Sequence, residues 1–152
     1  MRNIKLLHLQ VPLEDSLKDT LKVMRYLEHI ALLDFEFRQW IENKFKNNCG
    51  VCLLKHVWQY VQNNFTYRED FFDEVIINPI HLLSIRAGDC DDFSLFIHTI
   101  LIAMGLSPRY ILLGAEKGKY THVAVFCLGT YVDGANVNFN IIPPKYRFYD
   151  FV

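Results

Sequence analysis

Apolar residues recur at three- and four-residue spacing in four segments of the chain, which is typical of amphipathic helices. Gly105 follows the last of these segments, where a helix C-cap belongs, and Pro108 comes soon after it. Asp15 or Ser16 can cap the first segment. The spacing therefore predicts helices over Ser16–Leu33, Phe35–Phe45, Val51–Asn64 and Asp89–Met104.

Beyond Pro108 the pattern changes to short runs of β-branched and aromatic residues, which favour strands. We expect turns at Glu116–Lys119 and at Leu128–Gly129 between these runs. Helices followed by strands indicate an α+β domain, in which N-terminal helices and a central helix that bears Cys90 pack on a small antiparallel sheet. The predicted strands are Tyr110–Leu113, Thr121–Cys127 and Thr130–Val132.

Length and composition fit one domain with a substantial core, because the chain has 152 residues of which 51% are hydrophobic. The 16 basic and 17 acidic side chains nearly cancel, which argues against binding to nucleic acid through a basic surface. No apolar run approaches the length of a membrane-spanning helix, roughly 18 residues or more. The first residues lack the apolar core of a secretory signal. We therefore expect a cytoplasmic protein with no membrane partner.

Cys90 lies in the first turn of the predicted Asp89–Met104 helix. Unpaired backbone N–H groups and the positive end of the helix dipole stabilise a thiolate at this position, and the same N–H groups can bind an oxyanion. Gly88 allows a close approach or a sharp turn just before the cysteine. The alternative is a buried structural cysteine. Three acidic side chains oppose thiolate formation by proximity: Asp89, Asp91 and Asp92.

A thiol nucleophile needs a base, and His122 stands out because it begins an otherwise apolar strand, where it requires a polar partner. A two-residue turn at Leu128–Gly129 places Asp133 diagonally across from His122, about 7–8 Å away and within reach of a longer side chain. Asp133 would then orient the imidazole. A turn one residue longer would instead bring Asn136 opposite His122.

Together these residues resemble the transglutaminase-like superfamily, a papain-like group of cysteine enzymes. The arrangement is similar to the compact proteins of this type in bacteria and in phage or prophage genomes. It divides a single domain over 1–152 into an N-terminal helical segment at 1–48 and a motif-bearing core at 50–140. The matching segments are Val57–Tyr67, Ile77–Pro79, Gly88–Asp92, Met104–Tyr110, Thr121–Val125 and Tyr131–Gly134.

The resemblance implies that Cys90 is the nucleophile, that His122 is the general base and acid, and that Asp133 orients His122. The Cys90 N–H would serve the oxyanion, with Trp58 or Tyr67 as candidates for a second donor. The thiolate would attack an amide of a protein or peptide substrate and form a thioester without a cofactor or a metal. Water would resolve the thioester in a peptidase or amidase, and an amine would do so in a transglutaminase. The location would be the host cytoplasm, or the virion if a phage encodes the protein.

Three other interpretations remain open. The fold could serve as a non-catalytic binding or structural module, for example in phage assembly. Cys49 and Cys52 form a C-x-x-C pair at a predicted helix start, as in thiol-disulfide oxidoreductases, although no strand precedes them. We expect no bond and no metal between these thiols, with Cys49 ending one helix and Cys52 packed in the next. The acidic residues around Cys90 could bind a hard cation, but a solvated acidic helix start is the simpler interpretation.

If the catalytic interpretation holds, we expect the Cys90 sulfur and a ring nitrogen of His122 to lie within about 4 Å of each other.

Overall fold

The computed structural model describes residues 7–11, 17–71 and 74–152. Its helices are α1 (Leu17–Leu33), α2 (Phe35–Phe45), α3 (Gly50–Asn64), α4 (Pro79–Ile85) and α5 (Cys90–Ala103). Its strands are β1 (His8–Gln10), β2 (Thr66–Tyr67), β3 (Val75–Ile77), β4 (Ala87–Gly88), β5 (Arg109–Gly114), β6 (His122–Cys127), β7 (Thr130–Val132) and β8 (Phe148–Phe151).

The main sheet has the strand order β7-β6-β5-β8, and all its neighbours run antiparallel. Leu128 and Gly129 connect β6 to β7 with positive φ angles of 50° and 70°, as a type I′ hairpin turn requires. Cys127 therefore faces Thr130, which is the register that a two-residue turn predicts. Two further pairs complete the strands, namely β1 with β3 and the short parallel pair β2 with β4.

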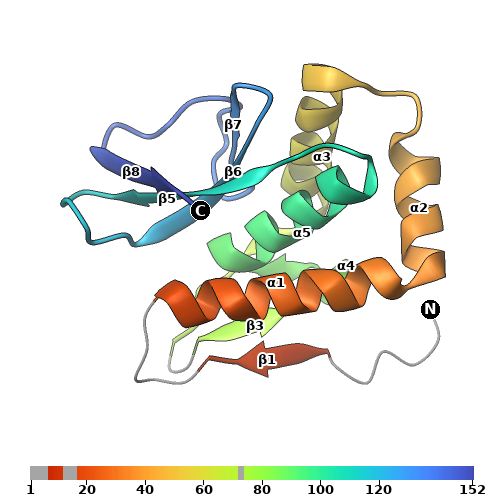
Figure 1. Ribbon diagram of the computed structural model, residues 1–152, viewed down its shortest axis with the longest axis horizontal. Coiled ribbons are helices and arrows are strands. Elements are labelled where there is room, and N and C mark those ends of the chain that lie inside the picture. Colours follow the sequence, from red (N-terminus) through yellow and green to blue (C-terminus); the bar gives the residue numbers. More distant parts are fainter. Residues whose placement is uncertain (1–6, 12–16, 72–73) are drawn as a thin grey trace.

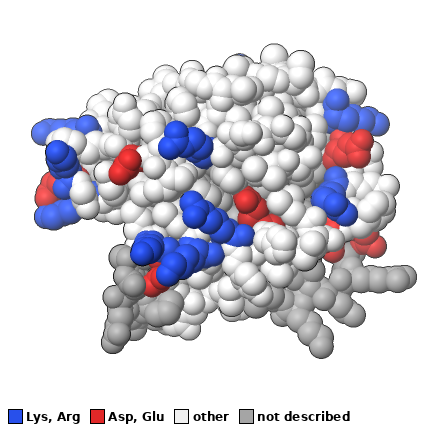
Figure 2. Space-filling view, viewed as in Figure 1, with Lys and Arg blue, Asp and Glu red and all other residues white. Residues whose placement is uncertain are grey.

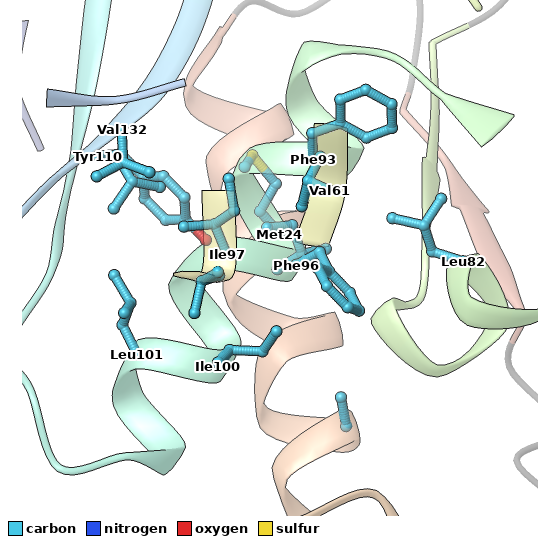
Figure 3. Close-up of a cluster of buried hydrophobic side chains, with 14 of the residues drawn as sticks. Met24, Val61, Leu82, Phe93, Phe96, Ile97, Ile100, Leu101, Tyr110 and Val132 are labelled. Carbon is cyan, nitrogen blue, oxygen red and sulfur yellow. The ribbon is translucent and has the colours of Figure 1, made fainter. Parts of the chain in front are cut away.

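Helix α5 lies at the centre of the molecule, between the main sheet and the other helices (Figure 1). Its residues are apolar on nearly all sides, as expected of a helix that is covered all round. Figure 3 shows Phe93, Phe96 and Ile97 of this helix among side chains from α1, α3 and the sheet, including Met24 and Val61. The rest of the fold is built around this helix.

The α+β fold class is confirmed, and so are the main elements. Helix α2 has the predicted bounds, α3 begins one residue earlier than predicted, and α5 is one residue shorter than predicted at each end. Helix α1 is described from Leu17 and ends at Leu33 as predicted. The predicted caps Asp15 and Ser16 lie outside the described residues. Helix α4 and strand β8 were not predicted, nor was the pairing of β1 with β3. Among the described residues, no helix is long and apolar enough to cross a membrane.

The predicted positions of Cys49 at a helix end and of Cys52 in a packed interior are wrong. Cys49 is the N-cap residue of α3 and does not end α2, and Cys52 lies on the exposed side of α3. Both thiols are free.

Gly134 follows β7 where the chain passes directly over α3 and α5. A Cβ atom at this position would lie 2.8 Å from Cβ of Phe93 and 3.0 Å from Cγ1 of Val61. The substitution Gly134→Ala should therefore lower the free energy of unfolding by about 1–3 kcal/mol, as overpacking does. Urea unfolding measures this change. Val137→Ala, at a side chain that is 77% exposed, is the control and should change stability by less than about 0.5 kcal/mol. Equal stability of Gly134→Ala and wild type would show that the loop does not need this close approach.

Candidate active site

Cys90 is the first residue of α5, immediately after the short strand β4. Gly88 is required just before it, because a Cβ atom there would lie 2.6 Å from Oδ2 of Asp92. Asp89 is the N-cap residue, and it forms a capping box with Asp92. Oδ1 of Asp92 also accepts a hydrogen bond from the Ile77 N–H at 2.8 Å, which ties β3 to the start of α5. The helix start is thus held by its own capping box and by the hydrogen bond to β3.

The capping arrangement leaves the Cys90 N–H for other use. Oδ1 of Asp89 accepts from the Asp91 N–H at 3.0 Å and from the Asp92 N–H at 3.5 Å, and the Asp89 carbonyl accepts from the Phe93 N–H. Within the described part of the chain, the Cys90 N–H makes no hydrogen bond. It is the one backbone N–H of this turn that is left to donate a hydrogen bond to a ligand oxygen.

Helix α5 contacts strand β6 through the peptide groups of Val123. The Ser94 hydroxyl, one turn after Cys90, donates to the Val123 carbonyl at 2.9 Å. The Val123 N–H interacts with the Cys90 sulfur. Because Val123 directly follows His122, these contacts bring the start of α5 to the end of the strand that carries His122.

Asp133 holds His122 as predicted. Nε2 of His122 lies 2.7 Å from Oδ2 of Asp133, and the two side chains are 9% and 3% exposed. The Tyr131 hydroxyl donates to the same oxygen at 2.7 Å, and the Ala135 N–H donates to Oδ1 at 2.9 Å. The Asp133 carboxylate is thus held by three donors, and Nδ1 of His122 remains for other contacts.

The loop that carries Asp133 is anchored to α3. The Trp58 indole N–H donates to the carbonyls of Asp133 at 3.1 Å and Asn136 at 3.0 Å. Gln62 donates to the Gly134 carbonyl at 2.5 Å. The alternative role of Asn136 is excluded, because its amide donates to the Ile141 carbonyl and its oxygen accepts from the Asn138 N–H.

A pocket of about 360 Å³ opens beside His122. The Tyr146 ring lies parallel to the imidazole, with 5.1 Å between ring centroids and 3° between planes. Tyr67, Glu69 and Lys145 line the pocket with these two rings. A substrate can therefore reach the imidazole from this side.

The sulfur of Cys90 makes its hydrogen bond to Oδ1 of Asp91, at 3.9 Å. The expected contact of about 4 Å between this sulfur and a His122 ring nitrogen stays a prediction. Burial raises the pKa of the Cys90 thiol well above its usual range, and the nearby Asp91 and Asp89 carboxylates raise it further. The thiolate expected at the helix start is therefore not favoured in this structure, because burial and acidic neighbours outweigh the helix N-terminus.

The acidic residues at the helix start are internal, so the interpretation of a solvated acidic start is wrong. Asp89 is 8% exposed and Asp92 is 2% exposed. Burial raises the pKa of Asp89 to about 6 and that of Asp92 to about 8, with charged neighbours adding to both shifts. Burial also raises the pKa of Asp91, which shares a hydrogen bond with Glu74. The outer face with α1 in front shows more Lys and Arg than acidic side chains (Figure 2).

One ligand atom each from Asp89, Cys90 and Asp91 lies within 4.8 Å of the others, so among the residues that the structure describes these three are the ones that could hold a metal ion. The Asp89 carboxylate already accepts two backbone N–H groups in the cap. The group therefore has a structural role that needs no ion.

Two residues of the site were not predicted from the sequence. Tyr131 could have been found, because it stands two residues before Asp133 and alternate residues of a strand share a face. Tyr146 lies beyond the predicted core at 50–140, and no local pattern connects it to His122.

The sequence profile of a transglutaminase-like domain family matches residues 14–132. This match covers most of the chain, and the chain belongs to that family. No curated protein sequence matches it.

Two solved structures share the fold. One is a candidate cysteine protease from Cytophaga hutchinsonii, with a TM-score of 0.51 and 14% sequence identity over 93% of this chain. The other is a candidate protease from Parabacteroides distasonis, with a TM-score of 0.61 and 10% identity over 80% of this chain. The chain spans 54% of the first protein and 26% of the second. At these identities the likeness confirms the papain-like fold class.

The raised pKa of Asp92 predicts how stability depends on pH. The folded state binds this proton more tightly than the unfolded chain does, so the stabilisation is complete below about pH 4 and is lost as the pH rises to about 8. Between pH 5 and pH 8.5, the free energy of unfolding of wild type should fall by more than that of Asp92→Asn. The expected difference exceeds about 1.4 kcal/mol, which corresponds to one pKa unit. Urea unfolding at both pH values measures it, and parallel losses in the two proteins would contradict the assignment.

Proposed function

We propose that this protein is a cysteine-dependent acyl-transfer enzyme that acts on amide or peptide bonds through a thioester. Cys90 is the nucleophile, His122 is the general base and acid, and Asp133 orients His122. The observation that carries the proposal is the hydrogen bond between Nε2 of His122 and Asp133. His122 begins β6, and Ser94 of α5 binds the next residue of that strand, Val123, one helix turn after Cys90. Membership in the transglutaminase-like family supports it.

The first half of the reaction forms the thioester. Because the resting thiol keeps its proton, His122 accepts that proton at Nδ1 while the sulfur bonds to the carbonyl carbon. The carbonyl π electrons move to the oxygen, and the Cys90 N–H binds the resulting oxyanion. When the oxyanion collapses, the C–N bond breaks, and the leaving amine takes the proton from His122.

The second half releases the acyl group. A water molecule or an amine loses a proton to His122 as it attacks the thioester carbon, and the C–S bond then breaks. The sulfur recovers its proton from His122. Water gives an acid, as in a peptidase or amidase, and an amine gives a new amide, as in a transglutaminase. Asp133 binds the imidazole N–H throughout and stabilises the imidazolium, with Tyr131 and Ala135 holding its side chain.

Replacement of the nucleophile tests the proposal. Cys90→Ala should abolish acyl transfer from 4-nitrophenyl acetate, because Ser94 is engaged with Val123 and cannot substitute. Its thermal melt should remain close to that of wild type, with a loss of at most about 1–2 kcal/mol, because alanine favours the helix. The release of 4-nitrophenol in a pre-steady-state burst measures the activity.

Cys52→Ala is the matched control, because it removes an exposed free thiol at the start of another helix. It should leave the burst unchanged. A burst that survives in Cys90→Ala would show that the assigned nucleophile is wrong. A folded wild type without any burst above the Cys90→Ala background would favour the non-catalytic module.

His122→Ala should also lose the burst, and Asp133→Asn should reduce its rate by about 10⁴-fold if the residue sets the imidazole tautomer. The rate of the burst against pH measures the effect. An Asp133→Asn protein with the wild-type rate would show that the bond between Asp133 and His122 is only structural.

A further inference from the structure

The oxyanion in the proposed reaction has one donor on the chain, the Cys90 N–H, and a second donor would greatly increase its stabilisation. The two candidates from the sequence were Trp58 and Tyr67. The structure separates them. The Trp58 indole N–H is already shared between the carbonyls of Asp133 and Asn136, at 3.1 and 3.0 Å. Trp58 thus supports the Asp133 loop and has no hydrogen left to donate.

Tyr67 lies beside the nucleophile. Strand β2 pairs with β4 so that Tyr67 faces Gly88, and the Arg68 N–H donates to the Gly88 carbonyl at 2.8 Å. The Tyr67 ring meets that of Phe93, in the first turn of α5, edge to face at 6.1 Å. Tyr67 therefore borders the first turn of α5.

The hydroxyl of Tyr67 is available to a substrate. Tyr67 lines the pocket that also contains His122, and the residue is 45% exposed. Across the residues described in the structure, its hydroxyl makes no hydrogen bond. Burial of the ring raises its pKa beyond the usual range, and Cys90 contributes more to that shift than any other neighbour. The phenol therefore keeps its proton at neutral pH and lies in the field of the sulfur.

We propose that Tyr67 is a catalytic residue whose hydroxyl donates the second hydrogen bond to the oxyanion that forms when Cys90 attacks a carbonyl group. The inference rests on the proposed function. The Cys90 N–H and the Tyr67 hydroxyl then bind the oxygen from the α5 side, while His122 moves the proton from the sheet side. No proton leaves Tyr67 in the reaction.

The variant Tyr67→Phe tests the role, because it removes only the hydroxyl. The rate of Cys90 acylation by 4-nitrophenyl acetate should fall about 100-fold, the typical effect of losing one oxyanion donor. The rate of Cys90 alkylation by iodoacetamide should stay at the wild-type value, because displacement of iodide forms no oxyanion. The thermal melt should also be unchanged, because the hydroxyl has no hydrogen-bond partner among the described residues. Tyr26→Phe, which alters a tyrosine on α1 that is 52% exposed, is the matched control and should leave both rates unchanged.

The outcomes separate this inference from the proposed function. If wild type acylates Cys90 and Tyr67→Phe does so equally fast, Tyr67 is not the donor and the proposed function stands. If Trp58→Phe is the variant that loses acylation but keeps alkylation, the indole is the donor. If both rates fall together in Tyr67→Phe, the residue supports the thiol and not the oxyanion. If wild type acylates no faster than Cys90→Ala, the proposed function and the role of Tyr67 both fail.

Discussion

Helix α5 and strand β6 meet at the peptide groups of Val123, and this contact determines the geometry of the site. Strand β7 ends opposite Val125, so the ladder that it forms with β6 stops before Val123. Helix α5 takes its place there: Ser94 binds the Val123 carbonyl, and the Cys90 sulfur interacts with the Val123 N–H. One helix turn and one strand end are thereby joined by polar contacts inside an apolar core. A shift of the strand by one residue would turn every side chain of β6 to the other face of the sheet, which would remove Val123 and Val125 from the core around α5 and His122 from Tyr146.

At the start of α5, the acidic residues that cap the helix oppose the ionisation of the neighbouring Cys90 thiol. The cap needs Asp89 and Asp92 to bind the first N–H groups and to connect the helix with β3. Burial raises the pKa values of these carboxyls. The neighbouring Cys90 thiol is buried too, and its own burial raises its pKa, with the Asp91 and Asp89 carboxylates raising it further. The resting protein therefore keeps Cys90 as a thiol, and in the proposed reaction the proton must leave during the attack. In that reaction His122 must accept the proton and carry a positive charge. Asp133, which would stabilise that charge, is held in place by two donors besides the imidazole.

The sequence predicted the elements whose stability is local. The period of apolar residues located four helices, and the two-residue turn at Leu128–Gly129 fixed the register that brings Asp133 to His122. It did not predict α4, a short helix whose N-cap is Asn78, or β8, which follows an irregular loop and pairs with β5. It also missed Tyr146, because stacking on His122 depends on the path of that loop and not on any spacing. The solvated state expected for Asp89 and Asp92 was wrong because both side chains are buried by the tertiary fold, in which the Ile77 N–H of β3 binds Asp92.

The central claim is that Cys90 carries the acyl group, and the most direct measurement is to locate that group. Wild-type protein is mixed with 4-nitrophenyl acetate, quenched in acid within the burst, digested and analysed by mass spectrometry. The account predicts one acetyl group on the peptide that contains Cys90, removable by hydroxylamine as a thioester is, and its absence in His122→Ala. Acetylation of Cys49 or Cys52 at the same rate as Cys90, or an equal yield on Cys90 in His122→Ala, would contradict it.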